Sequence, residues 1–147
     1  MEVNEKNFTQ QHNMAENAVH EMFLAIDMVQ TMLKAMNPAI LFDLEKYHPK
    51  AYKKFKQHKN NFYYQVMFNN IHRGISEGVY KQVIHADILA RYRVSAVFLI
   101  FDTEVFPSTK YHLNEVFWEI TANYLHGLVT TKGNIIHTYT SYAIKHK

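Results

Sequence analysis

The sequence predicts an all-α fold, a single-domain bundle of about six helices, and three observations support this prediction. The 147 residues include only three prolines and four glycines, and so few helix breakers favour long helices over a many-turned β fold. Hydrophobic residues make up 48% of the chain and charged residues 20%, a balance that suits a buried core and is not typical of disorder. Apolar residues recur at helical spacing along several segments, as they do in amphipathic helices that pack together.

The first expected helix spans about residues 9–36 and ends before Asn37-Pro38. Its apolar side chains share one helix face, and they are Met14, Ala18, Met22, Ile26, Val29, Leu33 and Met36. The opposite face is polar, with His12, Glu16, His20, Asp27 and Lys34. We expect residues 1–8 to be disordered or frayed, so that the domain occupies residues 9–147.

The second expected helix is short and covers residues 38–47. Pro38 suits its first turn, where the missing amide hydrogen costs nothing. His48-Pro49 ends it, and a long third helix follows from about residue 50 to residue 74 or 77. Gly78 is the expected C-cap, because glycine tolerates the left-handed conformation found there.

The fourth expected helix begins near His85 and ends before Pro107. Its centre, residues 96–101, is apolar on all sides and could by itself form a buried strand. Because no breaker lies between residues 79 and 106, we expect a helix in the middle of the bundle. Ser108 or Thr109 is the expected cap of a fifth helix that ends between residues 127 and 130, and a last helix starts at residue 130 or 131.

The fifth expected helix has two apolar sides. One side carries Leu113, Phe117, Ile120, Tyr124 and Leu128, and the other carries Trp118, Ala122, Leu125 and Val129. Such a helix is either the centre of a monomeric bundle or has one side against a partner subunit. The pattern leaves both interpretations open.

Three segments resemble landmarks of the C-terminal, ligand-binding and dimerisation domain of TetR-family transcriptional regulators. IHRGISEGVYK at residues 71–81 is similar to that family's GI-x-EG-x-[FY]-[RK]. YLHGLVTTKG at residues 124–133 is similar to YL-x-GI-x-T-x-x-G, and LFDLEKYHP at residues 41–49 is similar to dL-x-kyyP. The three occur in the family's order, so the resemblance covers the chain from about residue 9 onward. The helix-turn-helix headpiece that enters the DNA major groove in that family has no counterpart in this sequence.

The resemblance implies a homodimer and a pocket for a small apolar molecule whose binding modulates DNA affinity through a headpiece missing from this chain. The content of ten Phe, ten Tyr and seven Met suits an adaptable apolar pocket, although a plain core needs the same residue types. The expected pocket residues are Phe23, Ile26, Phe62, Met67, Phe98, Trp118 and Thr121. The expected dimer-interface residues are Ala122, Leu125, Val129, Ile135, Ile136 and Tyr139.

Other functional classes find little support in the sequence. We expect no enzymatic activity, because no nucleophile elbow, phosphate loop or dinucleotide motif is present. We also expect no cofactor and no metal, since a di-iron bundle needs a second Glu-x-x-His besides the one at residues 45–48. The alternatives to a regulator are a standalone dimeric module that binds a small molecule without any DNA function and, less favoured, a helical-bundle metalloenzyme.

The net charge and the length of the apolar runs indicate which partners and which cellular location to expect. A net charge of +3 does not by itself indicate nucleic acid. A lysine-rich run is expected to be a solvated helix face, because its members go round the helix; they are Lys46, Lys50, Lys53, Lys54, Lys56 and Lys59. With no cysteine, no signal-peptide pattern and no apolar run longer than residues 96–101, we expect a cytoplasmic protein that does not enter membranes.

Overall fold

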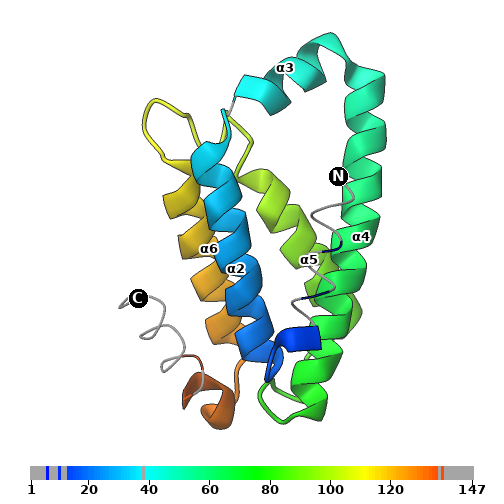
Figure 1. Cartoon of the computed structure of the whole chain (residues 1–147), viewed down its shortest axis with the longest axis vertical. Coiled ribbons are helices and arrows are strands. Elements are labelled where there is room, and N and C mark those ends of the chain that lie inside the picture. Colours follow the sequence, from blue (N-terminus) through cyan, green and yellow to red (C-terminus); the bar gives the residue numbers. More distant parts are fainter. Residues whose placement is uncertain (1–5, 7–9, 11–12, 38, 136, 138–147) are drawn as a thin grey trace.

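Four long helices lie side by side, and a short helix crosses one end of them (Figure 1). This arrangement is seen in a computed structural model that describes residues 6, 10, 13–37, 39–135 and 137. The named helices are α2 (Ala18–Ala35), α3 (Ala39–Tyr47), α4 (Pro49–Ser76), α5 (Ala86–Leu99) and α6 (Leu113–Leu128). No β-strand occurs among the described residues, so the predicted all-α bundle is confirmed. The predicted frayed segment, residues 1–8, lies outside the described residues except for Lys6.

The predicted helix of residues 9–36 is interrupted, because residues 10, 13 and 14 are helical but residues 15–17 are not, and α2 starts at Ala18. Asn17 is the N-cap, and its side-chain oxygen accepts a hydrogen bond of 2.8 Å from the His20 amide. This capping bond competes with a continuous helix, because it requires extended backbone at residue 17. Met14, expected on the buried stripe, lies before this break and is 77% exposed.

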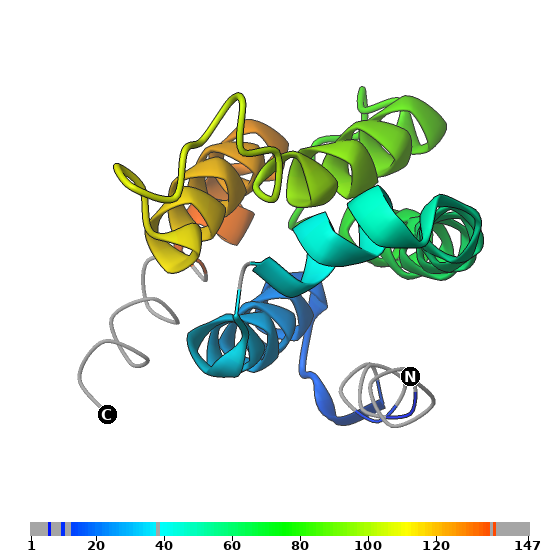
Figure 2. The same cartoon turned by 90° about the horizontal axis from the view of Figure 1, so that it is seen from above.

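Helices α3 and α4 match the expected segments. Pro49 occupies the first turn of α4, where a proline is tolerated. At the other end of α4 the amide of Gly78 donates to the Ile75 carbonyl, and Gly78 has a φ of 75°. The predicted left-handed turn at Gly78 is thus confirmed. Figure 2 shows α3 passing above the space that α2, α4 and α5 surround.

Helices α5 and α6 are both shorter than predicted. Helix α5 ends at Leu99, well before Pro107, and Leu99 is 41% exposed, so residues 96–101 are not a fully buried helix centre. Helix α6 starts at Leu113 with His112 as N-cap, which shows that Ser108 and Thr109 do not cap it. Instead, the Pro107 carbonyl accepts from the amides of Lys110 and Tyr111 in a turn that precedes α6.

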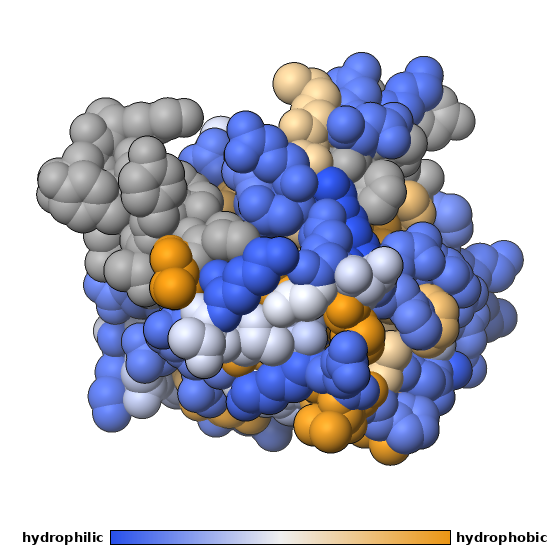
Figure 3. Space-filling view, turned by 90° about the horizontal axis from the view of Figure 1, so that it is seen from below, coloured by the Kyte–Doolittle hydropathy of each residue, from blue (hydrophilic) through white to orange (hydrophobic). Residues whose placement is uncertain are grey.

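Two of the segments that carry the family resemblance pack against each other at the end of the bundle opposite α3. Tyr80 and Val129 form an isolated antiparallel bridge, and the Thr130 hydroxyl donates to the Gly78 carbonyl at 2.8 Å. A Cβ on Gly74 would collide with the Tyr80 ring, so glycine is required for this close approach. The surface at this end is largely hydrophilic with apolar patches between the polar residues (Figure 3).

A partly buried polar cluster fastens the start of α2 to the end of α4, and we call it the anchor. Arg73 donates to the Glu21 carboxylate at 2.9 Å, and Asn70 donates to the same carboxylate at 2.7 Å. The Glu77 carboxylate accepts from the Ala18 amide at 2.7 Å and from Arg73 at 3.2 Å. Charge-assisted bonds of this kind fix the N-terminal end of α2 relative to α4. The remainder of α2 is held by apolar packing.

Candidate functional site

An apolar cavity of about 220 Å³ lies inside the bundle and is the candidate functional site. It is bordered by all five named helices: one wall is α2, one is α4, one is α5, and α3 and α6 contribute Leu41 and Phe117. Of its 19 lining residues, only Lys59, Tyr63 and Arg93 carry polar atoms in their side chains. A site of this composition favours a largely apolar guest.

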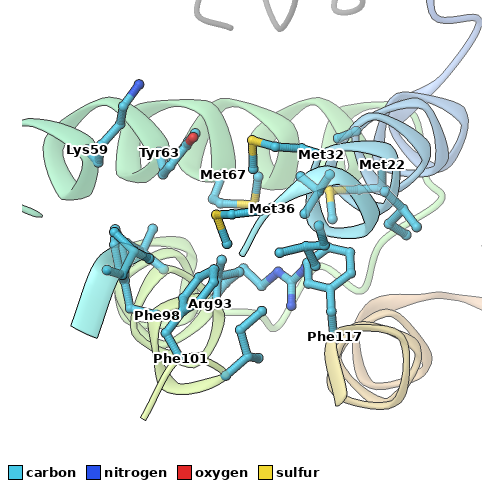
Figure 4. A pocket seen from close by; sticks show the side chains of 18 of the residues that line it. Met22, Met32, Met36, Lys59, Tyr63, Met67, Arg93, Phe98, Phe101 and Phe117 are labelled. Atoms are coloured by element: carbon cyan, nitrogen blue, oxygen red, sulfur yellow. The ribbon is translucent and has the colours of Figure 1, made fainter. Parts of the chain in front are cut away.

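Four methionines from α2, its C-terminal end and α4 converge on the cavity (Figure 4), and they are Met22, Met32, Met36 and Met67. Methionine is unbranched and has a polarisable sulfur, so it can adjust to guests of different shape. At the inner end Met22, Ile26 and Phe117 are almost fully buried, with exposed fractions of 2%, 3% and 2%. Towards α3 the lining side chains are only half-buried, as Phe98 and Phe101 are, so the cavity opens in that direction.

Arg93 of α5 is the polar residue at the inner part of this cavity. It is only 3% exposed, and its guanidinium extends towards Phe117 of α6 (Figure 4). One terminal nitrogen, Nη2, donates to the Thr121 hydroxyl at 2.6 Å. The guanidinium carbon lies 5.5 Å from the Phe117 ring centre and 5.1 Å from that of Tyr124.

The charge of Arg93 is incompletely compensated. Its Nε and Nη1 atoms are buried without a hydrogen-bond partner, and no carboxylate among the described residues forms an ion pair with it. Burial lowers the Arg93 pKa well below its ordinary value, to about 10, so the side chain is still a cation at neutral pH. Burial also raises the pKa of the Tyr124 phenol, which therefore stays neutral beside it. Buried cations are normally paired, so this arrangement needs an explanation.

Lys59 of α4 differs from Arg93 in its orientation. Although Lys59 is only 4% exposed, its side chain runs away from Arg93, and its ammonium lies 5.6 Å from the Tyr63 ring centre (Figure 4). The predicted solvated face holds for Lys46, Lys50, Lys53 and Lys54, which are exposed. It does not hold for Lys59, which is buried although its ammonium points away from the cavity.

The structure brings three of the seven predicted pocket residues into the cavity wall. These are Ile26, Met67 and Phe98. Phe23 and Trp118 pack on each other beside the cavity, with ring centres 6.5 Å apart. Thr121 is fully buried and reaches the cavity only through its hydrogen bond with Arg93.

Phe62, the remaining predicted pocket residue, is half-buried and lies against Tyr63 with ring centres 5.6 Å apart. It is not part of the wall.

The second apolar side of α6, predicted for a dimer interface, is partly covered by the chain itself. Leu125 is 1% exposed and Val129 is 7% exposed, so little of either side chain is left for a partner to cover. Ala122 is half-buried, whereas Ile135 is 66% exposed. The other two predicted interface residues, Ile136 and Tyr139, lie outside the described residues.

Arg93 is not among the residues predicted from the sequence, yet the helix pattern contains a signal for it. Ala90, Val94 and Val97 share the inner face of α5, and Arg93 falls between them on that face. A charged residue on an otherwise apolar helix face is an informative exception. The signal is easy to miss because another arginine, Arg91, lies two residues before Arg93. Arg91 is exposed and pairs with Asp87, but the sequence alone does not distinguish it from Arg93.

Other chemistry is not indicated by the described part of the chain. No group of three or more His, Asp or Glu side chains is placed to hold a metal ion there. No helix within the described ranges is long and apolar enough to cross a membrane. Comparisons of the chain with protein-family models, with curated proteins and with solved structures found no match.

Proposed function

We propose that this chain binds a small, largely apolar molecule in the cavity between α2, α4, α5 and α6, as the effector-binding domain of a TetR-like transcriptional regulator. The observation that carries the proposal is the cavity itself, about 220 Å³ in volume and lined by methionine and aromatic side chains. Engineered apolar cavities of about 150 Å³ already bind benzene, so this one has room for a somewhat larger guest.

The size of the cavity favours a binding role over imperfect packing. Protein cores are close-packed, and voids larger than a water molecule are few. At about 24 cal/mol per Å³, an enclosed empty cavity of this volume would cost roughly 5 kcal/mol, which is the upper bound for a cavity open at one end. Such a cost is comparable to the stability of a whole domain. A guest that restores the missing contacts accounts for why the space is kept.

The regulatory part of the proposal rests on the family resemblance and on where the cavity lies. In the family that the sequence resembles, the pocket lies between the helices that α2 and α6 correspond to. Here α2 lines the cavity along most of its length, and α6 contributes Phe117. Helix α2 borders it from Met22 to Leu33, while its N-terminal end is fixed by the anchor. A guest that packs against this stretch would therefore bias the position of α2 relative to α4. If α2 has two positions, the guest can shift the equilibrium between them only by the difference in its binding free energy for each.

The binding role is tested with a neutral dye that fluoresces only in apolar surroundings, N-phenyl-1-naphthylamine, and a variant that fills the cavity. Ala25 lines the cavity and is 9% exposed, so Ala25→Phe places a ring inside it. Ala35→Phe makes the same change on the exposed side of α2 and is the matched control. We expect saturable dye binding that Ala25→Phe weakens at least tenfold and Ala35→Phe leaves unchanged. Dye binding that both variants retain equally would disprove a guest in this cavity.

The dimer and the regulatory role need separate measurements. Static light scattering at tens of micromolar is expected to give twice the mass of 17.4 kDa, and a monomer would remove the homodimer from the proposal. The DNA-binding role would belong to a headpiece outside this sequence. Hydrogen exchange of the N-terminal segment is then compared with and without the dye. If the dimer binds the dye and exchange in this segment does not change, the result would favour a standalone binding module without DNA function.

A further inference from the structure

The unpaired guanidinium of Arg93 is the feature that says most about the guest. Arg93 lines an otherwise apolar cavity, and two of its nitrogen donors, Nε and Nη1, are enclosed by the protein and have no hydrogen-bond partner among the described residues. Its third nitrogen is held by the Thr121 hydroxyl, which fixes the plane of the group. The guanidinium also lies against the Phe117 and Tyr124 rings of α6, so its plane is held before any guest arrives, and a guest has to displace neighbouring side chains to reach Nε and Nη1.

An anion is the chemical partner that such a group lacks. A guanidinium offers parallel N–H donors that match the two oxygens of a carboxylate or similar anion. Moving an ion pair out of water is costly chiefly because both ions lose their hydration. Here Arg93 has already given up its hydration in the folded chain, so only the guest's head group adds a further cost. The rings of Phe117 and Tyr124 stabilise the cation but supply no acceptor for its free N–H groups.

We infer that the guest is an anionic amphiphile, a carboxylic acid with an alkyl or aryl tail, whose carboxylate pairs with Arg93. This inference rests on the proposed binding function and names its ligand class. The carboxylate lies at the inner end beside Arg93 and Phe117. The tail extends through the methionine-lined part of the cavity towards α3, where Phe98 and Phe101 line the opening.

The test compares octanoate with 1-octanol, which share one tail and differ in the charge of the head group. Isothermal titration calorimetry of the wild-type chain is expected to show octanoate binding at least tenfold more tightly. Arg93→Met is expected to remove this preference, because a hydrogen-bonded charged contact contributes about 10- to 100-fold in affinity. Arg91→Met, on the exposed face of the same helix, is the matched control and keeps the preference.

The outcomes separate the ligand class from the binding function. Equal binding of octanoate and octanol to the wild type overturns the anionic head group and leaves the binding function intact. Failure of both to bind, together with failure of the dye, overturns the binding function itself. A preference for octanoate that persists in Arg93→Met overturns the role of Arg93.

A measurement on the wild-type chain alone covers the case in which Arg93→Met does not fold. Filtered NOE spectra of bound octanoate are expected to connect its C2 protons with the Phe117 ring and its terminal methyl with Phe98. The reversed pattern, with the methyl group beside Phe117, overturns the proposed orientation.

Discussion

Replacing Arg93 by methionine is expected to leave the ligand-free fold as stable as the wild type, or more stable by about 1 kcal/mol. The fall of the Arg93 pKa from its ordinary value to about 10 corresponds to roughly 3 kcal/mol by which folding disfavours the cation. Since the folded pKa is the lower one, this cost is present in full below about pH 10 and therefore at neutral pH. Methionine is unbranched and carries no charge, so it removes the cost.

The interactions that the guanidinium makes in the wild type offset most of this gain, because methionine cannot replace them. The hydrogen bond to Thr121 and the two ring interactions together contribute about 2 kcal/mol. The Thr121 hydroxyl can then donate to the carbonyl one turn earlier in α6, so it is not left unsatisfied. The balance of roughly 3 kcal/mol against about 2 kcal/mol gives the expected small gain. Apolar replacements of buried charges often have this effect.

Urea unfolding at pH 7 followed by circular dichroism measures this balance. Arg91→Met is the control, because that arginine is exposed and its removal should change the stability by no more than about 0.5 kcal/mol. A destabilisation of more than about 2 kcal/mol in Arg93→Met would refute the reasoning. It would mean that Arg93 holds α5 to α6 as a structural residue and that its charge is not kept for a guest.

Three further changes probe the fold around the site. Arg73→Met leaves the Glu21 carboxylate buried without its ion pair and is expected to cost about 2 kcal/mol in urea unfolding, since a fifth of the Arg73 side chain is exposed. Gly74→Ala forces the Tyr80 ring to move and is expected to cost about 1–3 kcal/mol in the same assay; an unchanged midpoint would show that the ring relocates freely. Burial, with a smaller contribution from His126, lowers the His137 pKa below its ordinary value of 6.5, so protonation favours the unfolded chain. Wild-type stability should therefore fall as the pH drops below about 6.5, and this part of the decrease should be absent in His137→Leu.

Local signals determine those parts of the fold that the sequence predicts well. The boundary between α3 and α4 follows from Pro49, which cannot donate a hydrogen bond yet suits a first helical turn. The turn after α4 follows from Gly78, whose φ of 75° few other residues tolerate. In both places the backbone chemistry of one residue decides the structure. No distant contact has to be known in advance.

The helix ends that the sequence misplaces depend on contacts between distant segments. Helix α2 starts at Ala18 because the Ala18 amide is bound by the Glu77 carboxylate, 59 residues away in the chain. Asn17 alone is a weaker signal, since an asparagine also occurs within helices. Helix α5 ends at Leu99 although no breaker follows before Pro107, and hydrophobic periodicity gives no warning of that end.

The candidate site is harder to predict because apolar residues of the core and of a cavity wall obey the same rule. Ile26 and Phe23 are both buried on α2, but only Ile26 lines the cavity. Whether Ile26 or Phe23 borders the cavity depends on small differences in how α5 and α6 pack against α2. No sequence pattern predicts these differences. Arg93 is different, because a charge on the inner face of α5 conflicts with the apolar core that the rest of that face predicts. In most proteins the polarity of a residue matches its place in the fold, with apolar residues inside and charged residues outside. Positions that break this match are expected at functional or strained sites. The charge of Arg93 is therefore a better basis for the proposed ligand class than the apolar residues that surround it.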